Sequence, residues 1–116
     1  MNIIEKTDEE LFEIAKPWWD NLIKYSNNKN YLMFIKNFAH ALREGANEME
    51  LGKQFARSDL AHNLSTEYDI LGTIRRGEHV TIVIRQKHKK KEGDWLGRLV
   101  LGYEDGEVKI FSVSLF

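Results

Sequence analysis

The residue types best suited to acid–base chemistry gather in one stretch of the sequence, "ARSDLAHNLSTEYD", residues 56–69. It contains two carboxyl groups, an imidazole and a phenol: Asp59, His62, Tyr68 and Asp69. Groups of these types transfer protons in many enzymes. Asp59 and His62 lie in a segment with little hydrophobic periodicity, so the simpler interpretation is a set of solvated polar residues near a helix end.

Two other patterns match catalytic or metal-binding motifs in their spacing alone. Ser26 and Lys29 have the S-x-x-K spacing of penicillin-binding enzymes, but the companion S-D-N and K-T-G elements of that mechanism are absent from the sequence. The four histidines do not pair at short spacing with carboxylates as zinc ligands do: His40, His62, His79 and His88. We therefore expect neither a metal nor a cofactor.

The densest charge cluster is the basic run "RQKHKKK", residues 85–91. Its lysine and arginine side chains could bind phosphate groups. However, Glu92 and Asp94 follow it at once, and the next basic pair, Arg75 and Arg76, lies at the opposite end of a strand about 30 Å long. These charges do not form one footprint, so a solvated hairpin is the simpler interpretation and nucleic acid is not an expected partner.

Helices are expected in the first half of the chain. Thr7 and Glu10 form a capping-box pattern at the start of the first helix. The apolar residues that follow repeat at helical spacing and include two adjacent tryptophans: Leu11, Phe12, Ala15, Trp18, Trp19, Leu22 and Ile23. A polar break at residues 26–30 separates this helix from a second one in "YLMFIKNFAHAL", residues 31–42, and residues 46–61 predict a weaker third helix.

From about Thr66 the hydrophobic period changes to two, which is typical of strands. Four strands are expected, separated by turns that contain glycine: residues 67–75, 79–88, 94–103 and 107–115. Matching the apolar residues of the second and third strands sets four pairs opposite each other: Ile84 and Leu99, Ile82 and Leu101, Val80 and Tyr103, and His88 and Trp95. Helices followed by an antiparallel meander predict an α+β domain with the N-terminal helices packed on one face of a curved sheet.

This arrangement resembles the nuclear transport factor 2-like superfamily, a cystatin-like α+β cone shared by ketosteroid isomerases and polyketide cyclases. The resemblance covers nearly the whole chain, residues 1–116. It depends most on "LVLGYEDGEVKIFSVSLF", residues 99–116, in which an apolar strand, an acidic turn with glycine and a final strand follow one another. It implies a cone-shaped fold with a cavity between the helices and the curved sheet.

The lining of that cavity would be largely aromatic: Trp18, Trp19, Tyr31, Phe34, Phe38, Tyr68, Ile82, Trp95 and Leu99. Aromatic walls suit a flat apolar ligand, although the same side chains could simply interdigitate as a core. In ketosteroid-isomerase-like relatives, an aspartate and a tyrosine transfer protons inside an apolar pocket. The resemblance therefore implies, as an alternative, a small cofactor-independent isomerase or cyclase in which Tyr68 acts with Asp59, Asp69 or His62.

The sheet face turned away from the helices is expected to be apolar as well. Alternation along the strands places six large side chains there, unless a bulge intervenes in the last strand: Val83, Leu96, Val100, Phe111, Val113 and Leu115. An apolar patch of this kind usually marks a partner surface, and relatives of the fold often dimerise through it, so we expect a homodimer. A bulge near Ile110 and Phe111 would instead turn the last strand's apolar residues inward.

Length and composition set the remaining limits. A chain of 116 residues corresponds to one domain, and its 17 basic and 18 acidic residues favour neither nucleic acid nor a membrane surface. It has no cysteine and no apolar stretch long enough for a signal peptide or a membrane span, so we expect a cytoplasmic protein unless an export signal precedes it. The leading hypothesis is a noncatalytic module that binds a small apolar ligand or forms a homodimer.

Overall fold

The computed structural model describes residues 2–45 and 62–116. The first part contains a short 3-10 helix and three α-helices: η1 (Ile3–Glu5), α1 (Asp8–Asn27), α2 (Tyr31–Phe34) and α3 (His40–Gly45). The second part forms four strands: β1 (Leu64–Arg76), β2 (His79–His88), β3 (Trp95–Glu104) and β4 (Glu107–Leu115). They make one antiparallel sheet in the order β1-β2-β3-β4, which confirms the predicted α+β meander. The third helix expected at residues 46–61 lies outside the described residues.

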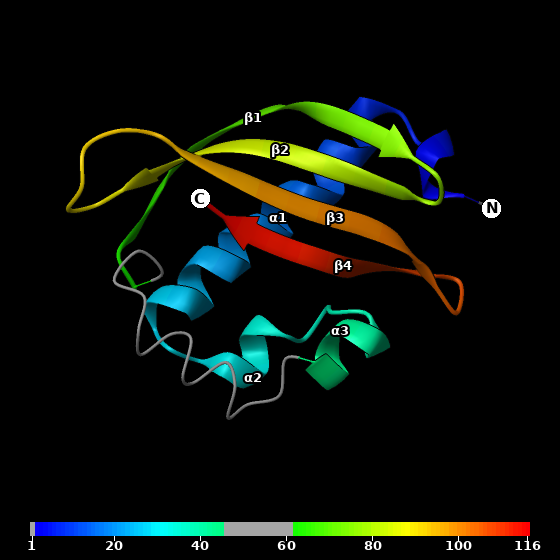
Figure 1. Ribbon diagram of the computed structural model, residues 1–116, viewed down its shortest axis with the longest axis horizontal. Coiled ribbons are helices and arrows are strands. Elements are labelled where there is room, and N and C mark those ends of the chain that lie inside the picture. Colours follow the sequence, from blue (N-terminus) through cyan, green and yellow to red (C-terminus); the bar gives the residue numbers. More distant parts are fainter. Residues whose placement is uncertain (1, 46–61) are drawn as a thin grey trace.

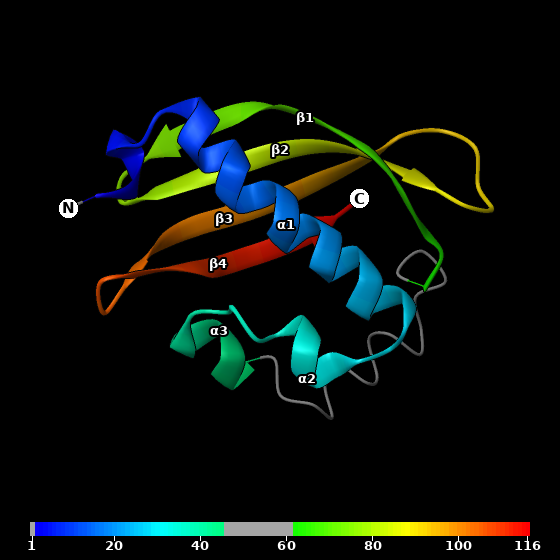
Figure 2. The ribbon, with the colours of Figure 1, turned by 180° about the vertical axis from the view of Figure 1, so that it is seen from behind.

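Helix α1 covers one face of the sheet, the inner face (Figure 2). It begins with the predicted capping box: the Thr7 hydroxyl accepts a hydrogen bond from the Glu10 backbone N–H, and the Glu10 carboxylate accepts one from the Thr7 N–H. The helix continues through Pro17 to its last residue, Asn27. Its apolar stripe is buried against the sheet at five positions: Leu11, Ala15, Trp19, Leu22 and Ile23. Burial of this stripe fixes α1 on the inner face.

The prediction of one helix over residues 31–42 is wrong. The chain leaves the helical path after α2 and returns to it in α3, and the intervening backbone pairs with strand β4. The Ala39 N–H donates to the Ile110 carbonyl (2.7 Å), and the Ile110 N–H donates to the Asn37 carbonyl (2.8 Å). These bonds satisfy polar groups on the open side of the last strand and place the Phe38 side chain in the core. Hydrophobic spacing in the sequence carries no signal for this pairing.

The predicted register between the second and third strands is also wrong, by two residues. Ile82 lies opposite Leu99 and Ile84 opposite Gly97. The two other expected pairs shift in the same way: Val80 lies opposite Leu101 and Trp95 opposite Gln86. A shift of two residues keeps every side chain on its face, so the apolar pattern cannot detect it. A Cβ atom at Gly97 would come within 2.8 Å of the Trp19 ring, so the indole occupies the space that a side chain at Gly97 would fill.

Strand β4 contains the bulge that was the competing prediction. Leu101 lies opposite Ile110 and Val100 opposite Ser112, which leaves Phe111 as an extra residue. Because the bulge changes the alternation, Val113 and Leu115 lie opposite Leu99 and Gly97 and pack against the core. Placing Val113 and Leu115 on the outer face was therefore wrong. Phe111 packs edge-to-face on the His79 ring, with the ring centres 4.7 Å apart.

Candidate functional site

The side chains expected to line a cavity contribute in different degrees to the inner-face core. Four of them are buried core residues: Trp19, Phe38, Ile82 and Leu99. Four more are partly buried and pack against that core: Trp18, Tyr31, Phe34 and Tyr68. Trp95 is half-buried near the end of β3, with its ring tilted against that of His88 at 5.7 Å between centres. Most of this aromatic set therefore contributes to packing between the helices and the sheet.

A buried polar network, absent from the sequence-based predictions, joins α1 to two strands. The Trp19 indole N–H donates to the Gln86 side-chain oxygen (2.8 Å). The Gln86 amide nitrogen in turn donates to the backbone carbonyls of Ser65 (2.7 Å) and Lys87 (2.8 Å). Gln86 is fully buried, and each of these bonds satisfies a group that would be costly to leave unpaired. The one sequence signal for the network is a glutamine at an inward position of the apolar strand "VTIVIRQKH".

Tyr68, the proposed proton donor of the enzyme alternative, is held by helix α1. Its hydroxyl lies 2.6 Å from an Asp20 carboxylate oxygen and 3.2 Å from the Lys16 carbonyl. Burial, reinforced by the hydrogen bond and the charge of Asp20, raises the pKa of Tyr68 well above its ordinary value. The phenol therefore stays protonated, and the hydrogen bond that it donates connects β1 to α1.

The other candidates for acid–base chemistry do not gather around Tyr68. Asp69 pairs with Arg85, 3.7 Å away, on the face of the sheet opposite to Tyr68. His62 is half-buried just before β1, and Asp59 lies outside the described residues. Among residues 2–45 and 62–116, no group of three or more metal-binding side chains could hold an ion. The structure therefore does not bring Tyr68 and Asp69 together in one site.

The outer face of the sheet, turned toward the viewer in Figure 1, is not covered by any helix of the described part of the chain. We call its apolar residues the outer patch: Leu71, Ile74, Val83, Leu96, Val100 and Phe111. Leu71, Ile74 and Leu96 are 52%, 56% and 42% exposed. The other three are half-buried by their neighbours in the sheet. Leu71, Ile74 and Leu96 are three of the five large apolar residues that are exposed in the described part of the chain; the other two are Leu32 and Phe116.

The strand pairing brings the outer patch together across β1, β2 and β3, with Thr81 and Arg98 among its apolar residues. Ile74 lies opposite Thr81, which lies opposite Val100, so these three form one row across β1, β2 and β3. Leu71 occupies a bulge beside Gly72, which pairs with Val83; because Val83 lies opposite Arg98, this row is apolar on β1 and β2 and charged on β3. Bulges and twist at β1 leave its side chains prominent. The result is a largely apolar surface over the middle of the sheet that also contains Thr81 and Arg98.

Charged groups border the outer patch at one end. Arg85 lies 3.7 Å from Asp69 and 3.8 Å from Asp94, and the Lys87 ammonium also pairs with Asp94. The hydrogen bond from Lys87, with the charges of Lys87 and Arg85, lowers the pKa of Asp94. Arg98 lies inside the outer patch, opposite Val83, and stacks over the Phe116 ring at 4.6 Å. Apolar side chains with an arginine among them and a mixed-charge border are a common composition of protein–protein interfaces.

Comparison with known proteins gives no match: no protein-family model, no curated protein and no solved structure matches the chain significantly. Within the described residues, no helix is both long and apolar enough to cross a membrane. The function is therefore argued from the residues themselves, and the outer patch is the surface with the clearest physical consequence.

Proposed function

We propose that the protein is a noncatalytic homodimerisation module whose two copies meet through the outer patch. The observation that carries the proposal is the exposure of Leu71, Ile74 and Leu96 on a sheet face that no described helix covers. Contiguous exposed apolar surface is costly in water and usually marks a contact surface. The same patch on two copies, related by a two-fold axis, would remove this surface from water.

The charges of the chain favour a second copy as the occupant. The net charge is −1, so two copies repel each other little at neutral pH. The border contains both signs, since Arg85 and Lys87 alternate with Asp69 and Asp94. A two-fold axis near the centre of the patch would set this mixed-charge border against the opposite end of the other copy's outer face, which contains Arg76 and Lys109. A strongly charged partner would not be attracted to this face, because its border has no excess of one sign of charge.

The dimensions of the sheet set the expected strength of the dimer. Strands of ten residues span about 33 Å, and four strand axes span about 14 Å. The area of such a face, about 460 Å², is smaller than the roughly 600–1,000 Å² per partner that standard stable complexes bury. We therefore expect a dimer that dissociates on dilution.

The fold arrangement supports a wider proposal, that the chain is a member of the nuclear transport factor 2-like superfamily. Its support is an N-terminal helix on one face of a four-stranded antiparallel meander and an open face on the other side. Relatives of that fold often dimerise through the open face. A small apolar ligand on the inner face stays part of this wider proposal, and the burial of the Trp19 and Phe38 side chains supports packing there instead.

Light scattering and sedimentation over a range of concentrations test the dimer. We expect the mass to rise from 13.6 kDa toward twice that value with concentration. Ile74→Lys and Val100→Lys should each hold the protein at the monomer mass, because a lysine cannot be buried unpaired at an apolar interface. Leu32→Lys is the matched control, since Leu32 is an equally exposed apolar residue (63%) on α2. A constant mass of 13.6 kDa, or equal effects of all three variants, would contradict the proposal.

A further inference from the structure

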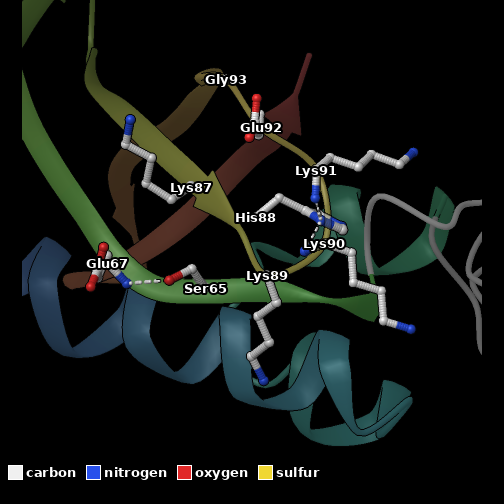
Figure 3. A pocket seen from close by; sticks show the side chains of 9 residues that line it. All are labelled: Ser65, Glu67, Lys87, His88, Lys89, Lys90, Lys91, Glu92 and Gly93. Atoms are coloured by element: carbon white, nitrogen blue, oxygen red, sulfur yellow. Dashed lines mark hydrogen bonds between the residues drawn. The ribbon is translucent and has the colours of Figure 1, made fainter.

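The loop between β2 and β3 forms one wall of a polar hollow of about 480 Å³ (Figure 3). The other wall is the start of β1. Its lining is almost entirely polar or charged: Ser65, Glu67, Lys87, His88, Lys89, Lys90, Lys91, Glu92 and Gly93. Hollows of a few hundred Å³ have the size of small-molecule sites. We call this feature the hairpin hollow.

The backbone of this loop is held in place by specific bonds. The His88 Nδ1 atom accepts hydrogen bonds from the backbone N–H groups of Lys90 (3.0 Å) and Lys91 (3.1 Å). The Lys89 N–H donates to the Asn63 carbonyl (2.8 Å), which ties the loop to the segment before β1. Gly93 has a φ of 111°, a backbone angle that favours glycine. These hydrogen bonds therefore fix the backbone conformation from which the loop's side chains extend.

Three of the lysines in the hairpin hollow make no ion pair within the described residues. Lys87 is paired with Asp94, whereas Lys89, Lys90 and Lys91 make no ion pair with any residue in the described parts of the chain. All three side chains are exposed, and the three lysines follow one another in the sequence, so their charges repel one another. Figure 3 shows them extending from the loop at the rim of the hollow. An anion bound among them would relieve this repulsion.

We propose that the hairpin hollow binds a compact anion with several phosphate groups, either inorganic polyphosphate or the phosphate chain of a nucleotide. Lysine binds phosphate as a point charge, so Lys89, Lys90 and Lys91 would turn inward around it. The Ser65 hydroxyl accepts a bond from the Glu67 N–H (3.0 Å), which leaves its own hydrogen free to donate to a phosphate oxygen. The N–H groups of Lys90 and Lys91 already bind His88, so the side chains would supply the contacts.

A compact anion fits the distribution of charge better than a nucleic acid strand does. The basic residues at the far end of β1 do not extend the site, because Arg75 is engaged with Asp8 (2.7 Å) and with the Lys6 carbonyl (2.8 Å). Nucleic acid binding requires a cationic path along a backbone of phosphates. The uncompensated charge here is confined to one loop, which matches a ligand of a few phosphate groups.

Glu67 and Glu92 allow a test in which two kinds of variant should change the affinity for the anion in opposite directions. Both line the hairpin hollow, and their charge opposes a bound anion. Removing a lysine charge should weaken binding, while Glu67→Gln and Glu92→Gln should each strengthen it. Loss of structure would weaken binding in every variant, so tightening by a glutamate variant cannot come from misfolding.

The experiment titrates the whole chain with sodium tripolyphosphate at low salt, by calorimetry and by tryptophan fluorescence, since Trp95 contacts the loop residue His88. The variant that replaces Lys89, Lys90 and Lys91 by glutamine should weaken binding by about tenfold or more, since charged contacts dominate such sites. The control replaces Lys36, Arg43 and Arg76 by glutamine, which removes the same charge elsewhere and should change affinity by less than about twofold. Adenosine triphosphate in a second arm distinguishes a nucleotide from inorganic polyphosphate.

Three results would overturn the proposal: no tripolyphosphate binding by the wild-type chain, equal weakening in both glutamine variants, or binding of a single-stranded oligonucleotide without binding of tripolyphosphate. Lys89, Lys90 and Lys91 lie outside the outer patch, although Lys87 belongs both to its charged border and to the lining of the hairpin hollow. Ile74→Lys should therefore retain tripolyphosphate binding even where it abolishes the dimer.

Discussion

The two faces of the sheet are made by the same strands and have opposite properties. On the inner face, β2 and β3 bury a continuous set of aliphatic side chains under α1, and the buried amide of Gln86 has its hydrogen-bond partners within the fold. On the outer face, leucine and isoleucine side chains are about half-exposed. The same residue types therefore stabilise the fold on one face and are available to a partner on the other.

The largest expected contrast is between two leucines of β3. Leu99 is fully buried, and Leu99→Ala should lower the free energy of unfolding by about 3 kcal/mol, because it loses apolar burial and leaves a cavity. Leu96→Ala, the same change on the outer patch, should cost less than about 1 kcal/mol in the monomer. Urea unfolding at low protein concentration measures both. Equal losses would mean that the outer patch is buried in the monomer.

Two glycines offer a second comparison between the faces. Gly97→Ala should destabilise the fold by about 1–3 kcal/mol, because its methyl group would overlap the Trp19 ring. Gly72→Ala is the control, since a methyl group there meets no atom within 4 Å. Thermal and urea unfolding distinguish them. A neutral Gly97→Ala would show that the indole can move away, which contradicts its role in setting the position of β3.

The buried network can be tested at a single atom. Trp19→Phe keeps most of the apolar ring but removes the N–H that binds Gln86, so an amide oxygen is left unpaired in the core. We expect a loss of about 1–2 kcal/mol in the free energy of unfolding. Trp18→Phe, at the neighbouring half-buried position, is the control and should cost less. The reverse order would place the important indole contact on Trp18.

The smallest expected effect concerns pH and the charged border of the outer patch. Lys87 lowers the pKa of Asp94 below its ordinary value of 3.8, so the folded-state pKa is below the unfolded one. The contribution of this pair is complete above the unfolded value and is lost as the pH falls through the folded value. Asp94→Asn should therefore have a slightly lower melting temperature than wild type at neutral pH. This difference in melting temperature should become smaller in acid. A difference in melting temperature that grows in acid would contradict a stabilising role for the Lys87–Asp94 pair.

Local patterns in the sequence were sufficient for the strands and for the start of α1. The alternation and the glycine turns placed four strands within a few residues of β1 to β4, and Thr7 with Glu10 marked the first helix correctly. The errors came from interactions between distant segments. The pairing of Asn37 and Ala39 with Ile110 depends on where β4 ends the sheet, which no local spacing reveals.

The candidate site was less predictable for a similar reason. Whether Val113 and Leu115 face the core depends on one extra residue, Phe111, and a bulge has no fixed sequence signature. The register error of two residues had the same origin, since both registers satisfy the apolar pattern. Only the packing of Trp19 over Gly97 distinguishes them, and that contact joins residues far apart in the chain.

The contact between residues 37–39 and β4 also bears on how the protein avoids fibre formation. A sheet can grow sideways without limit when its last strand offers free backbone groups to another chain. Here the middle of β4 is already occupied at Ile110, while the opposite boundary, β1, is interrupted by two irregularities in its pairing. Lateral growth is blocked at one side and disfavoured at the other. The edges of the sheet would therefore give copies associated through the outer patch little opportunity to grow into a fibre.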